Sequence, residues 1–358
     1  MSCKLLCPAP TARVYDDPAA FDLLEEEWKA LFQRSGGWNV FLSWQWFRQW
    51  WEAFGSDKEL RILALTGGDR LVGVAPMMVE TGPDGARTLA WIGSERTTDY
   101  CDLLVDPPYL ETLCQVLADF VAEGLGDGWQ RVELCSLPVS SALLAGFREI
   151  ARHRGIESHS VASNTCPVVR LAPTWEEYLA GLDKTHRHEL RRKIRRSQSA
   201  GDQTFRHLTT PEEVASGMES FFRLHRASRP DKAAFLDNVT EGFFRGVGSA
   251  FAREGWMQLS LMRIDGRDVA ASMAFTREDR VLLYNSGLDP DFRTYSVGIA
   301  LHAADIQLAI SQGKVWYDFL RGNEPYKYDF GAKDNPIYTL TLTPSSGGEG
   351  AGSESQRG

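Results

Sequence analysis

Apolar and polar positions alternate along the chain in segments that are typical of a mixed α/β protein. Leu60–Val79 and Gln258–Phe275 each form two apolar runs around a Gly-Asp or Asp-Gly turn, which predicts two β-hairpins. Val281–Ser286 predicts a strand, Ile299–Ile310 has helical apolar spacing, and Lys314–Leu320 predicts another strand. A strand, a helix and a strand within about forty residues predict a right-handed crossover between parallel strands, with ligands bound at their carboxyl ends.

The start of the crossover helix is a candidate anion site. Thr294 or Ser296 is able to cap it, and Gly298 lets backbone or ligand approach closely in the first turn. The free N–H groups at such a start attract phosphate. The second strand ends in a group of proton carriers and cations, and we expect this group to face the same hollow as the helix start: Asp318, Arg321, Glu324, Tyr326, Lys327 and Tyr328.

These residues carry a family resemblance. The order Tyr295-Ser296-Val297-Gly298, Tyr317-Asp318-Phe319, Arg321-Gly322 and Glu324-Pro325-Tyr326-Lys327 resembles the C-terminal half of the BioF2-like or CelD-like acyltransferases. That family belongs to the GCN5-related N-acetyltransferase (GNAT) superfamily and is akin to the Fem-type peptidoglycan aminoacyl transferases. TTDYCDLLV at 97–105 and HRHELRRKIRRSQSAG at 186–201 match further stretches of the family, so the resemblance covers residues 20–342.

The resemblance implies an N-acyltransferase whose co-substrate is an acyl-CoA such as acetyl-CoA, with no tightly bound cofactor. The superfamily's pyrophosphate loop usually begins with Arg or Gln, where this chain has Tyr295. The candidate donor-binding residues are Arg293, Ser296, Val297, Gly298 and Ala300. The candidate catalytic residues are Asp318, Glu324, Tyr326 and Lys327. The candidate substrate-binding residues are Asp99, Tyr100, Asp102, Arg187, Arg191 and Arg321.

An internal duplication is consistent with the resemblance. The two hairpins align at an offset of 197 residues, which sets Gly73 on Ala270, and a second pair of segments aligns Glu133 with Asp318 at an offset of 185. We therefore predict an α/β protein with two tandem GNAT-like domains, each a mixed sheet flanked by helices. The predicted division is an N-terminal extension at 1–14, a scaffold and acceptor-side domain at 15–165, a donor and catalytic domain at 166–345, and a disordered tail at 346–358.

Residues 184–196 form a basic segment in an otherwise acidic chain. It contains seven Lys or Arg and one Glu, whereas the whole chain has a net charge of -9. One interpretation is a solvated helix face, and the other is a seat for phosphates, with Arg187 and Arg191 holding one anion together. His186 and His188 lack nearby Cys or Asp partners, so no metal site is predicted.

Composition limits the class of protein. Apolar residues make up 43% and charged residues 24%, as in a soluble globular protein, and the negative net charge argues against nucleic-acid or membrane-surface binding by the whole molecule. The six cysteines have no CxxC spacing, which favours reduced thiols. The sequence has no signal peptide or membrane span, so we expect a cytoplasmic protein. Among eleven tryptophans, the cluster from Trp38 to Trp51 predicts a helix buried against a sheet.

The expected chemistry is attack by an amine on a thioester carbonyl held between the two parallel strands. Asp318 or Glu324 would take the proton, Lys327 would neutralise a phosphate or the oxyanion, and Tyr326 or Tyr328 would return a proton to the thiolate. The acceptor would be a small molecule or a cell-envelope or polysaccharide precursor. Two alternatives stay open: an aminoacyl-tRNA-dependent Fem-like aminoacyl transferase, and a non-catalytic glycan- or partner-binding protein on the same fold. The sequence does not predict the oligomeric state.

Overall fold

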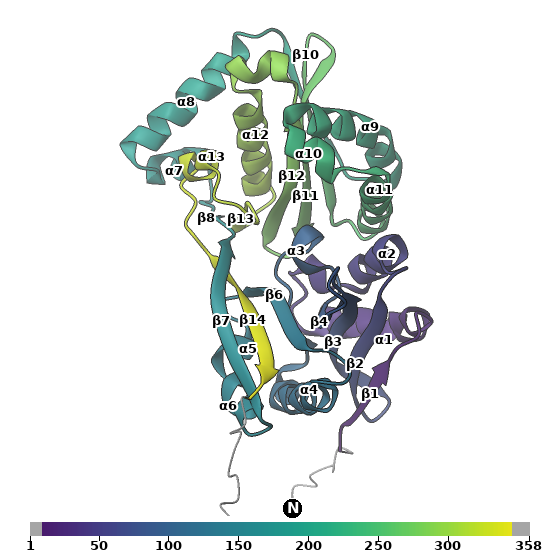
Figure 1. Ribbon diagram of the computed structural model, residues 1–358. Helices are drawn as coiled ribbons and strands as arrows, with labels where there is room; N and C mark the ends of the chain where they lie inside the picture. Colours follow the sequence, from purple (N-terminus) through teal and green to yellow (C-terminus); the bar gives the residue numbers. More distant parts are fainter. Residues whose placement is uncertain (1–8, 346–358) are drawn as a thin grey trace, which may run out of the picture.

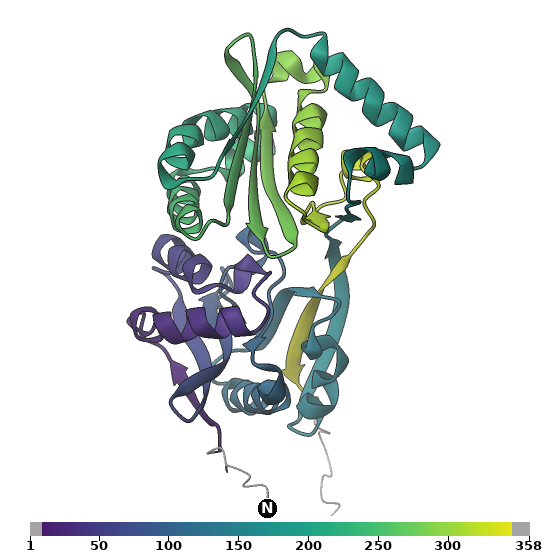
Figure 2. The same cartoon turned by 180° about the vertical axis from the view of Figure 1, so that it is seen from behind.

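The computed structural model describes residues 9–345, with the side chains of Ser94 and Glu95 left aside (Figure 1). The predicted tail at 346–358, most of the predicted extension at 1–14, and Cys3 and Cys7 lie outside this range. The described part of the chain forms two mixed sheets flanked by helices, one in each half (Figures 1 and 2). The predicted α/β fold class is thus confirmed.

The first sheet and its helices are built from β1 (Thr11–Tyr15), α1 (Ala20–Arg34), η1 (Val40–Leu42), α2 (Trp44–Phe54), β2 (Glu59–Gly67), β3 (Arg70–Thr81), β4 (Arg87–Trp91), α3 (Ser94–Thr97), β5 (Leu104–Val105), η2 (Pro107–Tyr109), α4 (Leu110–Gly124), β6 (Arg131–Pro138), α5 (Ala142–Ala145), α6 (Phe147–Arg152), β7 (Ile156–Thr165) and β14 (Pro336–Pro344). Its strand order is β1-β2-β3-β4-β6-β14-β7, and β5 pairs with β3.

The second sheet and its helices are built from β8 (Val168–Arg170), α7 (Trp175–Gly181), α8 (Lys184–Gln198), β9 (Gln203–Leu208), α9 (Pro211–Ser228), α10 (Pro230–Phe235), α11 (Asn238–Arg253), β10 (Met257–Ile264), β11 (Arg267–Arg277), β12 (Arg280–Leu288), η3 (Pro290–Tyr295), α12 (Val297–Ser311), β13 (Trp316–Asp318) and α13 (Pro325–Asp329). Its order is β8-β13-β12-β11-β10-β9. The predicted crossover is present, because β12 and β13 are parallel and α12 connects them.

The two halves repeat the same pairings. In the first hairpin the register shifts between Leu65 and Thr66, and in the second it shifts between Met262 and Arg263, which is the predicted offset of 197 residues. The parallel pairs end at Glu133 in β6 and Asp318 in β13, the two residues that the sequence aligned. A shared bulge and a shared strand end support duplication better than two hairpins alone.

The strand pairings differ from the predicted division of the chain in two places. β1 begins at Thr11 and pairs with β2, so residues 11–14 belong to the first sheet. β14 lies between β6 and β7 in the first sheet, although we predicted it as part of the second domain. Backbone pairing with strands about 170–200 residues earlier decides its place, and a local pattern of apolar residues does not encode such partners. The boundary at residues 165 and 166 stays a prediction.

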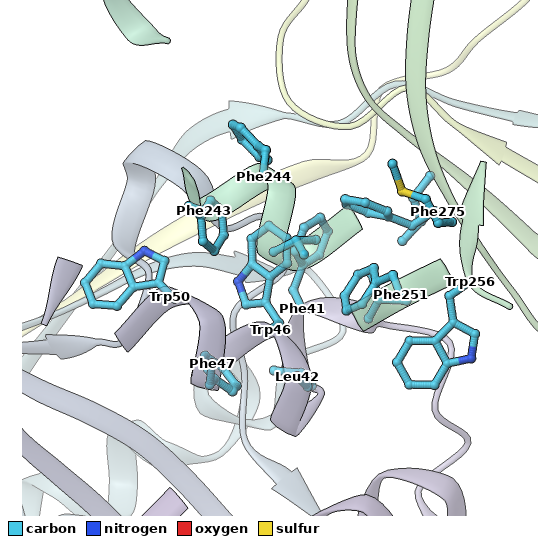
Figure 3. Packing of buried hydrophobic residues seen from close by; sticks show 14 of the residues in the cluster. Phe41, Leu42, Trp46, Phe47, Trp50, Phe243, Phe244, Phe251, Trp256 and Phe275 are labelled. Carbon is cyan, nitrogen blue, oxygen red and sulfur yellow. The ribbon is translucent and has the colours of Figure 1, made fainter. Parts of the chain in front are cut away.

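A single aromatic core joins the halves. The side chain of Ser43 caps α2 by accepting a hydrogen bond from the Trp46 backbone N–H, and α2 then buries its tryptophans. Figure 3 shows Trp46 of the first half packed among phenylalanines of the second. The ring of Trp46 lies edge-on to Phe243, with 5.1 Å between centroids, and to Phe275, with 6.0 Å. Trp46, Trp50 and Trp51 are therefore core, as predicted, whereas Trp38 and Trp44 are partly buried and pack against it.

Candidate functional site

The parallel strands β12 and β13 separate at the candidate site. They pair only through Arg280–Leu282 and Trp316–Asp318, after which β13 ends while β12 continues to Leu288. Two cavities lie along the edge of β12 that is left without a partner strand, one of about 500 Å³ and one of about 400 Å³. Five residues line both cavities and form their common wall: Arg229, Lys232, Ser286, Glu324 and Tyr326.

The larger of the two, which we call the helix-mouth cavity, opens at the start of α12. Ser296, Val297 and Gly298 line it, and Ser296 adopts a left-handed conformation with φ of 60°. No side chain caps the helix there, so the first backbone N–H groups of α12 remain available to a ligand. A Cβ atom on Gly298 would lie 3.3 Å from the Leu288 side chain, which leaves little room for a larger residue.

The other predicted donor-side residues lie near this opening. Arg293 lines the helix-mouth cavity, and its Nη2 donates a hydrogen bond of 2.7 Å to the Ser228 carbonyl. Ala300 does not line it and is buried in an apolar cluster with Met262 and Val269. Glu324 and Tyr326 reach the same cavity from the segment after β13, so the structure brings part of the predicted cluster to the helix start.

The smaller of the two, which we call the polar cavity, is lined by ion pairs. Arg321 Nε lies 2.9 Å from Asp99 Oδ1, and Lys327 Nζ lies 3.0 Å from Glu324 Oε2. Burial raises the pKa of Asp99 and the Arg321 charge opposes that rise. Burial also acts to raise the pKa of Glu324, but the ammonium of Lys327 outweighs it and lowers the pKa below its ordinary value. Glu324 is therefore a carboxylate at neutral pH.

Lys327 is almost fully buried and acts on its own loop. Its Nζ donates to the carbonyl oxygens of Leu320, Arg321 and Gly322 at 3.0, 3.0 and 2.8 Å. An ammonium has three protons, and these three carbonyl oxygens together with the Glu324 carboxylate already surround it. Lys327 thus stabilises the turn that carries Arg321 and Glu324. This role differs from the expected contact with a phosphate or an oxyanion.

Tyr326 is the candidate tyrosine that faces both cavities. Its ring stacks on His302 with centroids 5.5 Å apart and an angle of 15°, and burial raises its pKa. Tyr328 lines neither cavity, and its hydroxyl donates to Asp334 Oδ1 at 2.6 Å. The geometry therefore separates two tyrosines that the sequence left equivalent.

Asp318 lies outside both cavities. Its Oδ2 accepts a 2.7 Å hydrogen bond from the Tyr100 hydroxyl, and its Oδ1 accepts from the Leu320 N–H at 2.8 Å. Burial raises its pKa to about 7. The structure thus gives Asp318 a place in the contact between the halves and not beside the acceptor position.

The Asp-Tyr-Cys-Asp segment is divided among three places. Asp99 lines the polar cavity, and Tyr100 reaches Asp318. Asp102 points elsewhere, where its Oδ1 accepts from the Ser141 hydroxyl at 2.8 Å, and burial raises its pKa to about 6. Neighbouring residues separate here because Tyr100 has a φ of 53°, which turns the backbone sharply.

The predicted basic segment is helix α8, which lies on the outside of the second half (Figure 1). Arg191 is exposed, and Arg187 donates to the Ala180 carbonyl at 3.1 Å. Neither lines the two cavities. Lys193 does reach the helix-mouth cavity, where its Nζ also lies 2.5 Å from Asp329 Oδ2. Arg187 and Arg191 are therefore not placed to contact a ligand in either cavity, whereas Lys193 is placed to do so in one of them.

Sequence reasoning missed Lys232 of the common wall and His302 of the helix-mouth cavity. Lys232 lines both cavities and donates to the Ser286 carbonyl on the open edge of β12; burial and nearby Arg229 lower its pKa to about 8. His302 is buried under Tyr326, its pKa lowered by burial to about 3, and its Nδ1 has no hydrogen-bond partner within residues 9–345. A single histidine in an apolar helix and a lysine in a loop-like stretch carry no distinguishing sequence pattern.

The described residues contain no group of three His, Cys, Asp or Glu side chains able to hold a metal ion. Cys101, Cys114, Cys135 and Cys166 are buried thiols outside any disulfide. Within residues 9–345, no helix combines the length and the apolar character needed to cross a membrane.

Comparison with known proteins shows where this fold recurs. Residues 184–328 match the family model described as an acetyltransferase (GNAT) domain. The crystal structure of FemX is similar over 92% of this chain and 96% of its own, with a TM-score of 0.61 and 11% identity. The C-terminal domain of a putative lysylphosphatidylglycerol synthetase from Agrobacterium fabrum is similar over 91% and 92%, with a TM-score of 0.56 and 14% identity.

L-PGS from Bacillus licheniformis is similar over 93% of both chains, with a TM-score of 0.56 and 12% identity. No curated protein matches the sequence significantly. At these identities the likeness concerns the fold. The chain therefore has a GNAT-type acyltransferase fold with Fem-like neighbours, as the resemblance predicted.

Proposed function

We propose that this Fem-like protein of the GNAT superfamily is an N-acyltransferase that moves an acyl group from an acyl-CoA thioester to an amine. The observation that carries the proposal is the common wall between the helix-mouth cavity and the polar cavity. A donor bound at the start of α12 and an acceptor bound beside Arg321 and Glu324 would meet at that wall. Positioning two reactants in one place accounts for a large part of the rate in such reactions.

The donor side suits a phosphate-bearing thioester. The α12 start offers uncapped N–H groups, and Lys193, Arg229 and Arg293 give the helix-mouth cavity three cations, besides the proposed base Lys232, against the single lining carboxylate of Glu324. This excess of positive charge stands in a chain whose net charge is -9. A local excess of cations at a helix start is what an anionic donor requires.

The reaction can be written with the residues of the common wall. The acceptor nitrogen attacks the thioester carbonyl, so a C–N bond forms and the C–S bond breaks. Glu324, a carboxylate at neutral pH, attracts the acceptor ammonium. Lys232, whose pKa is lowered to about 8, takes the proton from that ammonium while its own amine is neutral. Tyr326, which burial keeps protonated, gives its proton to the leaving thiolate, and the second proton that the nitrogen loses as the amide forms restores the tyrosine.

The acceptor that we propose is an amine on a small molecule or on a cell-envelope or polysaccharide precursor, used in the cytoplasm. The polar cavity contributes the Arg321–Asp99 pair and the Glu324 carboxylate, which suit a polar acceptor carrying both charge and hydroxyl groups. An aminoacyl-tRNA donor is the second candidate, because α8 carries exposed cations outside the cavities.

Donor binding is tested by titrating acetyl-CoA into the wild type, Gly298→Asp and Gly242→Asp. We expect Gly298→Asp to weaken binding at least about tenfold, because the new carboxylate would repel phosphate where a side chain has little room. Gly242 lies in α11, where an added Cβ atom would meet no described atom within 4 Å, so the same substitution there serves as the matched control and should bind normally. Equal affinity in both variants would remove the α12 start from the donor site.

A further inference from the structure

A third cavity lies between the two halves and is separate from the candidate site. It has a volume of about 710 Å³ and shares no lining residue with the helix-mouth cavity or the polar cavity. We call it the interdomain cleft. Its size falls in the range of pockets that hold small molecules, and junctions between domains are frequent places for them.

Tyr100 forms the partition between this cleft and the loop of the candidate site. Its ring lines the cleft, while its hydroxyl donates to Asp318 and accepts from Asn335 Nδ2 at 3.0 Å. Asp318 in turn holds the Leu320 N–H at the start of the turn that carries Glu324. Two hydrogen bonds, from Tyr100 to Asp318 and from Leu320 to Asp318, thus connect the wall of the cleft to the turn that carries Glu324. The cleft itself does not open into the candidate site.

The wall of the cleft is rich in aromatic rings that come from both halves. Trp38 and Tyr100 belong to the first half and lie edge to face, with centroids 5.6 Å apart. Trp316 and Tyr178 belong to the second half. Trp38 and Trp316 are only half-buried, although tryptophan side chains that merely fill a core are generally enclosed. Partly exposed rings contributed by both halves offer a stacking surface for a flat ligand.

Cations stand among these rings. The Arg280 guanidinium lies 4.4 Å from the Trp38 centroid and 5.4 Å from that of Trp316, so it is within cation–π range of both indoles. Arg170 lies 5.9 Å from the Trp316 centroid and is exposed, as is Lys333 on the same cleft. Stacking on a ring occupies the face of a guanidinium and leaves its N–H groups at the edge free for an anion.

The acidic groups of the cleft do not balance these cations. Glu177 and Asp334 line it, but Asp334 already accepts hydrogen bonds from Tyr328 at 2.6 Å and from Thr165 at 3.3 Å. Three cations therefore line the cleft with two carboxylates, of which Asp334 is engaged, and Arg280 Nε also lies 3.7 Å from Asp279 Oδ1 outside the lining. The combination of flat rings and excess positive charge favours a flat ligand that carries a negative charge.

We propose that the interdomain cleft binds a small molecule of the nucleotide kind, in which a flat ring is joined to an anionic group. The ring would stack against Trp38 or Trp316, and the anion would lie at Arg170, Arg280 and Lys333. The proposal does not depend on the acyltransferase function. Because the ligand would touch both halves, its binding also fixes their separation at Tyr100.

The test is calorimetric titration of the whole chain with AMP and UMP, and with adenosine and inorganic phosphate as the two half-ligands. We expect both nucleotides to bind, with adenosine and phosphate each at least about tenfold weaker, since each lacks one of the two contacts. Trp38→Leu and the double variant Arg170→Gln with Lys333→Gln should each weaken AMP binding about tenfold or more. The double variant changes only exposed side chains, so its melting temperature should match the wild type.

Two further variants separate this site from the donor site. Gly298→Asp should leave AMP binding unchanged, because the α12 start lies outside the interdomain cleft. Arg206→Gln removes the charge of an exposed arginine on β9; it is the control for lost charge and should also bind AMP normally. The proposal is overturned if neither nucleotide binds. It is also overturned if Gly298→Asp abolishes AMP binding while Trp38→Leu and the double variant keep it, which would assign the nucleotide to the helix-mouth cavity.

Discussion

At the scale of single residues, the ionisable groups near β12 fall into two kinds. Some already form hydrogen bonds within the protein: Lys327 donates to three carbonyl oxygens, and Asp318 accepts from Tyr100. Others line both cavities, such as Glu324, Tyr326 and Lys232. The second kind is available to substrates. Glu324 and Tyr326 could be predicted from the sequence because they lie close along the chain to the α12 crossover, whereas Lys232 comes from a separate segment.

The pKa of Lys232 gives a test by pH. Burial lowers it to about 8, so the fraction of neutral amine grows as pH rises through that value. If Lys232 takes the acceptor's proton, kcat should rise through about pH 8 in the wild type, measured as thiol release from acetyl-CoA with saturating amine acceptor. Lys232→Met should lose this rise and reduce kcat by about a hundredfold or more.

Lys232→Arg distinguishes a base from a fixed charge. Arginine keeps the positive charge but does not release its proton in this range. The arginine variant should therefore be as slow as the methionine variant. Activity near that of the wild type in Lys232→Arg would show that the lysine acts by its charge alone.

At the scale of elements, helix α8 shows what a charge pattern encodes and what it omits. The sequence predicted a basic surface helix at 184–196, and the structure has it at Lys184–Gln198. Which cation reaches a cavity depends on how α8 lies against α12 and α13, and that packing is set by the whole second half. The charge pattern thus predicted the helix. It also predicted Arg187 and Arg191 as the ligand-binding cations, whereas Lys193 is the residue that lines the helix-mouth cavity.

The choice of donor can be tested on this helix. Lys193→Gln should raise the KM for acetyl-CoA about tenfold through loss of one charge beside the donor, while Arg191→Gln should leave it unchanged. Asp329→Asn removes the partner of Lys193 but not its charge, which separates the two effects. An equal and salt-dependent loss in Arg191→Gln would instead favour a nucleic-acid donor that covers the outer face of α8.

At the scale of the whole molecule, the two halves share one core. The aromatic core of Figure 3 contains Trp46 from one half and Phe243 from the other, and β14 at the end of the chain completes the first sheet. The hairpins and the crossover could be predicted because their partners are near in sequence. The place of β14 could not, since its alternating residues would suit the edge of either sheet.

This arrangement predicts that the first half does not fold without the end of the chain. β14 is bonded to β6 on one side and to β7 on the other, so its removal opens the sheet and leaves β7 without a neighbouring strand. A fragment of residues 9–165 should therefore lack a cooperative thermal transition in circular dichroism. Joining residues 336–345 to that fragment through a flexible linker should restore one, whereas a linked segment with β14 scrambled should not. The intact chain should melt in a single transition, because Trp46 and Phe243 belong to one core; two well-separated transitions would contradict a shared core.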